Sequence, residues 1–398
     1  MAASQVVTIA QPTAPVERLE ILDILRGFAL SGVLLVNFTG ALPKPTSAVD
    51  QATNWFIALF ATDSFYPLFA TLFGMGFVLQ FARWDARGAP ALRLYLRRVA
   101  GLYLLGLAIF CLLSTWWILL QYAVSALALL PFRRARTRTL LLAAASVYLV
   151  QTVVIPEYRM ATGIEAGPLG PPAEMRANGQ AIARLKKEGS YPALVVARAR
   201  TIVSFLTRPR WYLRLGLQPL PLLLLGAAIA RSRIVEQLGH YGRRLRWIVV
   251  WGALFELFAK AIVQWRSEAG LEWSGLGGRF LGHGLDLGQY VLSFAYAAGI
   301  CLLFLAGGSW RRRLAALAAV GRTALSNIFL QFLIISSLLF GYGLGLEGRI
   351  PALPYLGLNL VIFAAEIWLS RWWLARYRFG PLEWLWRSMT YWRLQSLS

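Results

Sequence analysis

The sequence has few of the residues that build metal centres and disulfide frameworks. It contains two histidines and two cysteines, and both Cys111 and Cys301 lie inside apolar runs. Neither a disulfide framework nor a cysteine-based metal site is therefore predicted. The sequence also has no metal-binding box, phosphate-binding P-loop, GxSxG motif or dinucleotide fingerprint, so we expect no bound cofactor.

Charged residues are scarce as well. They make up 15% of the chain, against 58% hydrophobic residues and a mean hydropathy of +0.57. Soluble domains carry about 25% charged residues, so this much apolar surface points to lipid as the solvent. The 16 Trp and 15 Tyr suit the headgroup level of a bilayer. The sequence predicts an all-α, polytopic membrane bundle forming a single membrane domain over residues 1–398.

The first 16 residues contain no Lys or Arg, unlike the basic start of a cleaved signal peptide. The first apolar run also contains Asp23 and Arg26. We therefore expect this run to be a retained helix.

Apolar runs long enough to cross a bilayer, which takes about 20 residues, predict about ten transmembrane helices. The predicted spans lie near residues 19–42, 55–81, 92–113, 116–132, 139–156, 213–230, 246–264, 285–306, 321–343 and 352–374.

Basic residues in the connections predict the orientation. The connections after the even-numbered spans hold 23 basic residues, whereas the short opposite connections hold four. Positive charge marks the cytoplasmic side, so both termini are expected in the cytoplasm. Because the arginines lie in short clusters between apolar runs, the net charge of +22 does not indicate nucleic-acid binding.

One long connection, residues 157–212, is expected on the outer side. After its Gly- and Pro-rich start, residues 181–206 mix Arg and Lys with large apolar residues. This pattern favours one or two amphipathic helices on the membrane surface; the alternative is a plain linker.

Polar residues at membrane depth are the candidate functional residues, because such groups are costly there and usually face the bundle interior. Asp23 and Arg26 stand three apart, so they share one helix face and are expected to form an ion pair. The pair either holds an anionic substrate or locks the first helix to its neighbours. Asn37, near the outer end of the same helix, is a further candidate for substrate binding.

Two later segments add candidates. His283 and Asp286 precede the eighth predicted span, where His283 could act as a base oriented by Asp286; the alternative is an ordinary surface histidine. Arg322, Asn327 and Gln331 recur on roughly one face at the start of the ninth span. They either bind a ligand or hold helices together.

Three blocks of the sequence resemble the YeiB-like proteins, the domain of unknown function 418 family. They are Leu22-Asp23-x-x-Arg26-Gly27-Phe28, Phe65-Tyr66-Pro67-Leu68-Phe69, and a C-terminal series within 213–398 that includes Gly321-Arg322-Thr323 and Phe379-Gly380-Pro381. The resemblance covers nearly the whole chain in the same order.

The resemblance implies a bacterial inner-membrane protein with distant kinship to transmembrane acyltransferases. In those proteins a cytoplasmic acyl-CoA serves as donor substrate for an outward-facing acceptor. Related sequences usually have a His and an Asp in the third and fourth spans, where this sequence has Ile109 and Trp117. Neither replacement can transfer a proton at neutral pH.

The leading hypothesis is an acyltransferase that modifies a cell-envelope glycan or lipid. Arg26 and Arg322 would hold the acyl donor, Asp23 and Asn327 would orient it, and His283 would be the catalytic base. The alternatives are a small-molecule transporter, with Asp23, Arg26 and Gln331 along its path, and a catalytically inactive scaffold. Beyond the lipid bilayer and such a substrate, no partner is predicted.

Overall fold

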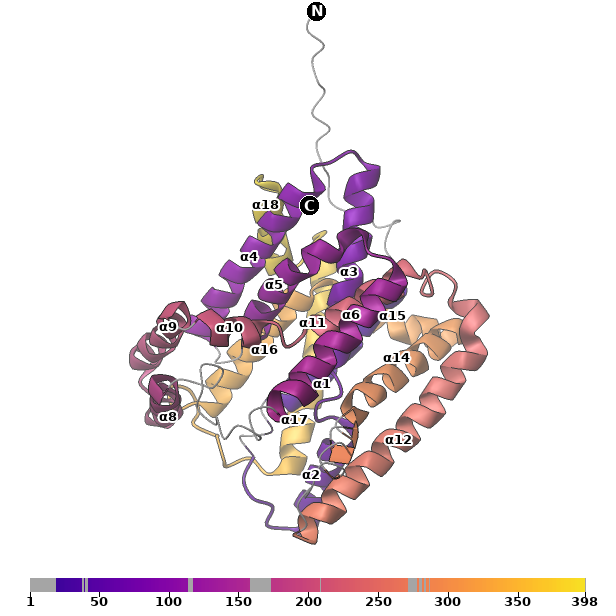
Figure 1. Cartoon of the computed structure of the whole chain (residues 1–398). Helices are drawn as coiled ribbons and strands as arrows, with labels where there is room; N and C mark the ends of the chain where they lie inside the picture. The colour runs from indigo at the N-terminus through magenta and orange to yellow at the C-terminus, as the bar shows by residue number, and fades with distance from the viewer. Residues whose placement is uncertain are drawn as a thin grey trace, which may run out of the picture.

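A computed structural model describes residues 19–397, apart from 38, 40–41, 114–116, 158–172, 208, 271–277, 279–280, 283 and 286. Every regular element in these ranges is a helix (Figure 1), which confirms the predicted fold class. The N-terminal elements are α1 (Glu20–Val36), α2 (Ala48–Phe60), α3 (Tyr66–Ala86), α4 (Ala91–Leu112), α5 (Ile118–Leu129), η3 (Leu130–Arg134), α6 (Thr137–Leu149), η4 (Val150–Val154), α8 (Ala173–Glu188) and α9 (Tyr191–Thr207). The later elements are α10 (Pro209–Gly216), α11 (Leu220–Arg231), η5 (Leu238–Tyr241), α12 (Gly242–Glu268), α14 (Gly288–Ala306), α15 (Gly308–Arg322), α16 (Ala324–Leu339), α17 (Ala352–Leu374) and α18 (Pro381–Tyr391).

Fewer than ten of the described helices meet the length and composition expected of a membrane-spanning helix. Within the described ranges, five helical stretches are long and apolar enough to cross a membrane, or six if the bent pair α15 and α16 forms one span. The count of ten is not confirmed. The interior helices explain much of the difference, because α1, α5 and α16 have 17, 12 and 16 residues. Surrounding helices shield the ends and polar groups of these interior helices from lipid. Interior helices therefore need neither the full length nor the uniformly apolar surface of a helix that faces lipid.

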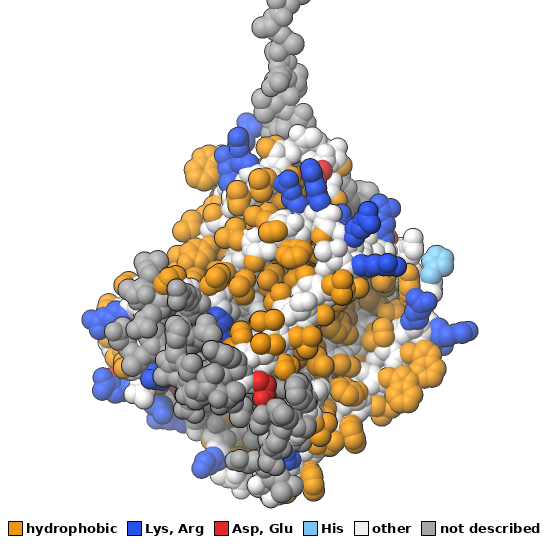
Figure 2. Space-filling model, viewed as in Figure 1, with side chains coloured by type: hydrophobic (Ala, Val, Ile, Leu, Met, Phe, Trp, Pro, Cys, Tyr) orange, Lys and Arg blue, Asp and Glu red, His pale blue; other side chains and the backbone are white. Residues whose placement is uncertain are grey.

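The outer helices present apolar side chains to their surroundings. On α12 the large side chains of Trp251, Phe258 and Trp265 are each at least 60% exposed. Figure 2 shows orange side chains across the middle of the molecule, with blue side chains towards its upper end, its right edge and its lower left. Such a distribution suits a lipid bilayer around the middle of the bundle. The cytoplasmic placement of the termini stays a prediction.

The predicted second span, residues 55–81, is in fact two helices. α2 ends at Phe60 and α3 begins at Tyr66. Between them Asp63 takes the left-handed conformation, with φ 61°, which interrupts a continuous helix. Lys260 of α12 stabilises the end of α2 by donating to the carbonyls of Ala58 and Leu59, at 2.9 and 2.8 Å. A cation bonded to the last carbonyls of a helix also interacts favourably with its dipole.

Glycines allow two pairs of interior helices to approach backbone to backbone. A Cβ atom at Gly27 of α1 would collide with the carbonyl oxygen of Leu317 of α15, and one at Gly321 with the carbonyl oxygen of Asp23. Gly74 of α3 and Gly226 of α11 form a second crossing of this kind. Small residues at helix crossings are the usual means of close packing in membranes. The two crossings fix α1, α3, α11 and α15 as the centre of the bundle.

The connection predicted to contain amphipathic helices contains α8 and α9 (Figure 1, left). α9 docks on the bundle through Arg198, a side chain with 0% exposure. Its guanidinium donates to the carbonyl oxygens of Leu112 and Leu113 at the end of α4, at 3.1 and 3.3 Å. These helices therefore contact the other helices as well as the surrounding solvent or lipid.

Arg198→Ala is expected to lower stability by roughly 2 to 3 kcal/mol, because it removes charge-assisted hydrogen bonds and leaves buried carbonyls without donors. The melting temperature of the protein purified in detergent would measure this. Arg200→Ala, two residues away on an exposed position, is the control. Equal melting temperatures for the two variants would contradict the docking role of Arg198.

Candidate functional site

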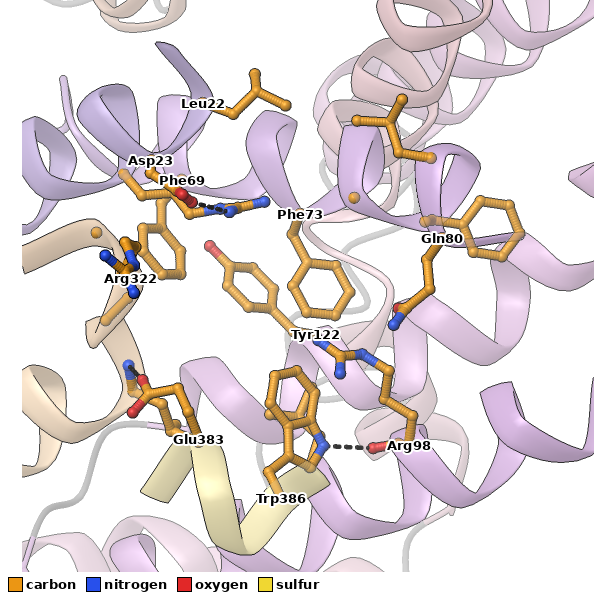
Figure 3. A pocket seen from close by; sticks show the side chains of 18 of the residues that line it. Leu22, Asp23, Phe69, Phe73, Gln80, Arg98, Tyr122, Arg322, Glu383 and Trp386 are labelled. Atoms are coloured by element: carbon orange, nitrogen blue, oxygen red, sulfur yellow. Dashed lines mark hydrogen bonds and ion pairs between the residues drawn. The ribbon is translucent and has the colours of Figure 1, made fainter. Parts of the chain in front are cut away.

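A cavity of about 240 Å³ lies among α1, α3, α4, α5, α18 and the bend between α15 and α16 (Figure 3). Five arginines line it: Arg26, Arg83, Arg98, Arg322 and Arg387. The acidic residues in its wall are Asp23 and Glu383, so the lining has a formal excess of three positive charges. A cavity with this charge attracts an anion.

The predicted pair of Asp23 and Arg26 is confirmed. Arg26 Nη1 donates to Asp23 Oδ1 at 2.9 Å, and both side chains line the cavity. The guanidinium lies close over Gly76 of α3, where a Cβ atom would be 3.6 Å from Nη2. Because the two residues are one helical turn apart, the pair was readable from the sequence.

Arg322 reaches the same cavity from α15. Its position depends on the close contact of Gly27 with α15 and of Gly321 with α1, and on the 78° bend between α15 and α16. The Nε atom of Arg322 is buried without a hydrogen-bond partner in the described structure. A buried donor that faces a cavity without a protein acceptor is open to an oxygen of a water molecule, an anion or a ligand.

The other predicted residues of the ninth span do not line the cavity. Asn327 Nδ2 donates to Thr323 Oγ1 and to Ser370 Oγ, both at 3.0 Å. Gln331 Nε2 donates to Glu366 Oε2 at 3.0 Å. Asn327 and Gln331 therefore connect α16 to α17, the second of the two interpretations that their spacing left open.

Two further candidates lie apart from the cavity or outside the described residues. Asn37 follows the last residue of α1, 14 positions from Asp23, which is roughly 21 Å along a helix. It does not contribute to this site. His283 and Asp286 lie outside the described residues, so the role of His283 as a base stays a prediction.

Aromatic rings form the inner wall of the cavity. The ring of Tyr122 lies 6.0 Å from that of Phe69 and 5.3 Å from that of Phe73. In Figure 3 the Tyr122 ring occupies the centre of the view, with its hydroxyl towards the side on which Asp23 and Phe69 lie. This hydroxyl is buried without a hydrogen-bond partner in the described part of the chain. The cavity thus offers cations at one wall, and an apolar surface with one free hydroxyl at another.

Sequence reasoning missed the contribution of α18. Trp386 Nε1 donates to the carbonyl oxygen of Arg98 at 2.7 Å, and the Arg98 guanidinium lies 3.6 Å from the centre of the Trp386 ring. This cation–π contact and hydrogen bond attach α18 to α4. The sequence signal for this contribution is the aromatic-rich stretch Trp384-Leu385-Trp386-Arg387.

Glu383 of α18 caps the start of α16. Its Oε1 accepts from the backbone N–H of Leu325 at 2.6 Å and of Ser326 at 3.2 Å, and its Oε2 accepts from Ser326 Oγ at 2.5 Å. Burial raises the pKa of the Glu383 carboxyl above its ordinary value, while the hydrogen bonds from Ser326 oppose the shift. Its oxygens are engaged in holding α16 next to the bend, so Asp23 is the carboxylate that can act on a ligand.

Burial also lowers the pKa of the Arg387 guanidinium, and the nearby carboxylates of Glu383 and Asp23 act in the opposite direction. An anion entering the cavity would likewise stabilise the charged guanidinium of Arg387 and oppose the lowering of its pKa. The electrostatics of α18 thus agree with an anion-binding site.

Comparison with known proteins identifies the family of the chain. Residues 229–393 match the family described as "Protein of unknown function (DUF418)". A 39.9 kDa protein encoded in the amylase 3' region of Bacillus acidopullulyticus is 31% identical over 96% of each chain. The chain belongs to the DUF418 family. YeiB of Escherichia coli is 29% identical over 94% of this chain and 96% of its own length, and YxaH of Bacillus subtilis is 27% identical over 96% of each chain.

The N-terminal part of this DUF418 protein has a second similarity. Residues 18–164 match the model described as "Heparan-alpha-glucosaminide N-acetyltransferase, catalytic". That range supplies α1, α3, α4 and α5, which form most of the cavity wall. The DUF418 range supplies Arg322, Glu383, Trp386 and Arg387. The cavity therefore lies where the two matched segments meet.

The two replaced family positions do not line the cavity. Ile109 of α4 is buried in the apolar core. Trp117 precedes α5, with its ring 5.4 Å from that of Phe110. Both side chains serve packing in this protein, so any proton transfer requires other groups.

Glu383→Gln is expected to destabilise the fold by about 1 to 3 kcal/mol, because an amide NH₂ group would face hydrogen-bond donors of α16. A lower melting temperature in detergent would show this. Glu236→Gln, at an exposed position, is the matched control and should leave the melting temperature unchanged. A Glu383→Gln protein as stable as the control would disprove the capping role.

Proposed function

We propose that this DUF418 protein is a membrane acyltransferase that binds the phosphate-bearing part of an acyl-CoA donor in the arginine-lined cavity. The observation on which the proposal rests is the meeting of Arg26, Arg98, Arg322 and Arg387 around one cavity. The similarity of residues 18–164 to an N-acetyltransferase catalytic segment supports the same class of reaction.

Phosphate suits the cationic wall. Guanidinium groups bind phosphate oxygens through paired, charge-assisted hydrogen bonds. The buried Nε of Arg322, which lacks an acceptor, would gain one from such an oxygen. Phe69, Phe73 and Tyr122 would pack against the apolar arm of the donor, with the Tyr122 hydroxyl available to its carbonyl oxygen.

A neighbouring groove provides room for the bulk of the donor. This groove, of about 860 Å³, lies between α1, α14, α15, α17 and residues 235–239, and it shares Leu19, Asp23 and Arg322 with the cavity. A nucleotide in the groove would place its phosphates next to Arg322. The reactive end could then lie against the aromatic wall.

Asp23 is the group in the cavity wall that could take a proton from the attacking acceptor. Its Oδ1 accepts from Arg26, and Glu383 is engaged as a helix cap. In the proposed step a hydroxyl or amine of a cell-envelope acceptor attacks the thioester carbonyl and forms a new C–O or C–N bond. The C–S bond breaks, the acceptor proton passes to Asp23, and the leaving thiolate takes up that proton, which restores the Asp23 carboxylate.

Arg322→Gln is expected to weaken binding of acetyl-CoA by about 10- to 100-fold, the effect of losing one charged hydrogen-bonding group. Calorimetric titration of the purified protein would measure it. Arg312→Gln is the control, because Arg312 lies on the same helix at an exposed position. If the wild-type protein does not bind acetyl-CoA, donor binding is excluded.

Asp23→Asn is expected to lower kcat by about 100-fold or more, the range for loss of a general base. The affinity for acetyl-CoA should be equal or higher, because a negative charge near the anion is removed. Transfer of a radiolabelled acetyl group to membrane glycans or lipids would measure the rate. Accumulation of a substrate in proteoliposomes without any acyl transfer would replace the proposal with a transporter.

A further inference from the structure

A second buried polar site lies between α16 and α17, separate from the cavity. Glu366, in the apolar spanning helix α17, is 1% exposed. It forms no ion pair with any Lys, Arg or His of the described residues. An ionised carboxylate is very costly in such surroundings unless a cation compensates it.

Gln331 of α16 is the hydrogen-bonding partner of Glu366. Its Nε2 donates to Glu366 Oε2 at 3.0 Å and to the backbone carbonyl of Leu30 at 3.4 Å. These two bonds use both hydrogens of the amide. Gln331 is 1% exposed, so bulk water does not compete for these groups.

One oxygen of each side chain remains without a donor. Glu366 Oε1 and Gln331 Oε1 are both buried and lack a hydrogen-bond partner in the described structure. Each is an acceptor, and an ionised glutamate has no hydrogen to offer. The pair therefore lacks one donor, and leaving such atoms unsatisfied is unfavourable.

We infer that the Glu366–Gln331 pair is a proton-binding site within the membrane domain, with the proton on Glu366 Oε1. The protonated acid is neutral, which removes the cost of burying a charge. It also supplies the missing donor, which the Gln331 carbonyl can accept. A carboxylic acid and a primary amide then form a reciprocal pair, each donating one hydrogen bond to the other.

The charges around α17 leave this pair isolated. α16 contains no ionisable residue, and α1 meets Gln331 through the carbonyl oxygen of Leu30. The charged residues of the other elements packed against α17 and of α1 are Glu20, Asp23, Arg26, Asp50, Arg311, Arg312, Arg313 and Arg322, with Arg371 on α17 itself. None of them forms an ion pair with Glu366, so no cation of the described residues compensates an ionised carboxylate at this site.

The proton site lies in a file of polar side chains that leads to the cavity. Asn327 lies four residues before Gln331 on α16, and Ser370 lies four residues after Glu366 on α17, a spacing of roughly 6 Å along a helix. They bond to each other and to Thr323 at 3.0 Å. Thr323 follows Arg322 at the bend, so this file of polar side chains ends next to the cavity.

Infrared spectroscopy of the purified, full-length protein tests this inference. At neutral pH the wild-type protein should show the C=O stretch of a protonated carboxyl, shifted by exchange into D₂O and lost in Glu366→Gln. Glu236→Gln, which removes an exposed carboxylate, should leave that band intact. Gln331→Leu should shift the band, because its hydrogen-bonding partner is gone.

The melting temperatures of two variants at Glu366 test the inference independently of the spectra. Glu366→Gln preserves a neutral amide pair and should melt within a few degrees of wild type, whereas Glu366→Ala should melt clearly lower. A band that persists in Glu366→Gln, or a carboxylate spectrum for Glu366 at neutral pH, would overturn the inference. So would a Glu366→Gln protein that is as unstable as Glu366→Ala.

Discussion

The backbone contact between α1 and α15 determines the geometry of the cavity. At Gly27 and Gly321 neither helix has space for a Cβ atom, so the helix axes approach more closely than side chains would otherwise allow. This contact brings Asp23 and Arg26 of α1 to the same cavity as Arg322 of α15. The bend after Arg322 then turns the chain into α16 and leaves space for α18. Without the contact, the charged residues of α1 and α15 would not line the same cavity.

Cations elsewhere in the bundle contact the backbone carbonyls at helix ends. Arg198 meets the last carbonyls of α4, and Lys260 meets those of α2. In each case the dipole of the helix end stabilises the charge, and Lys260 also pairs with Glu256 at 3.0 Å. The cavity differs because its arginines outnumber its carboxylates. That surplus distinguishes a site for an anion from the structural use of arginine and lysine in the rest of the molecule.

Local patterns in the sequence predicted local features well. The apolar run at residues 352–374 coincides with α17, and the spacing of Asp23 and Arg26 gave their ion pair. Features that depend on distant contacts were missed. Arg98 and Trp386 are brought together by the docking of α18 on α4, which no spacing reveals. The polar spacing of Asn327 and Gln331 indicated a buried face, but it could not show that this face meets α17 instead of the cavity.

The wall contributed by α18 has a consequence for biosynthesis. Trp386 and Arg387 follow every other wall-forming helix in the chain, and Trp386 holds α18 against α4 across 288 positions of sequence. During translation the membrane helices leave the ribosome and insert while the cavity is still open on this side. The cavity is thus completed only after all of its other wall-forming helices have been synthesised.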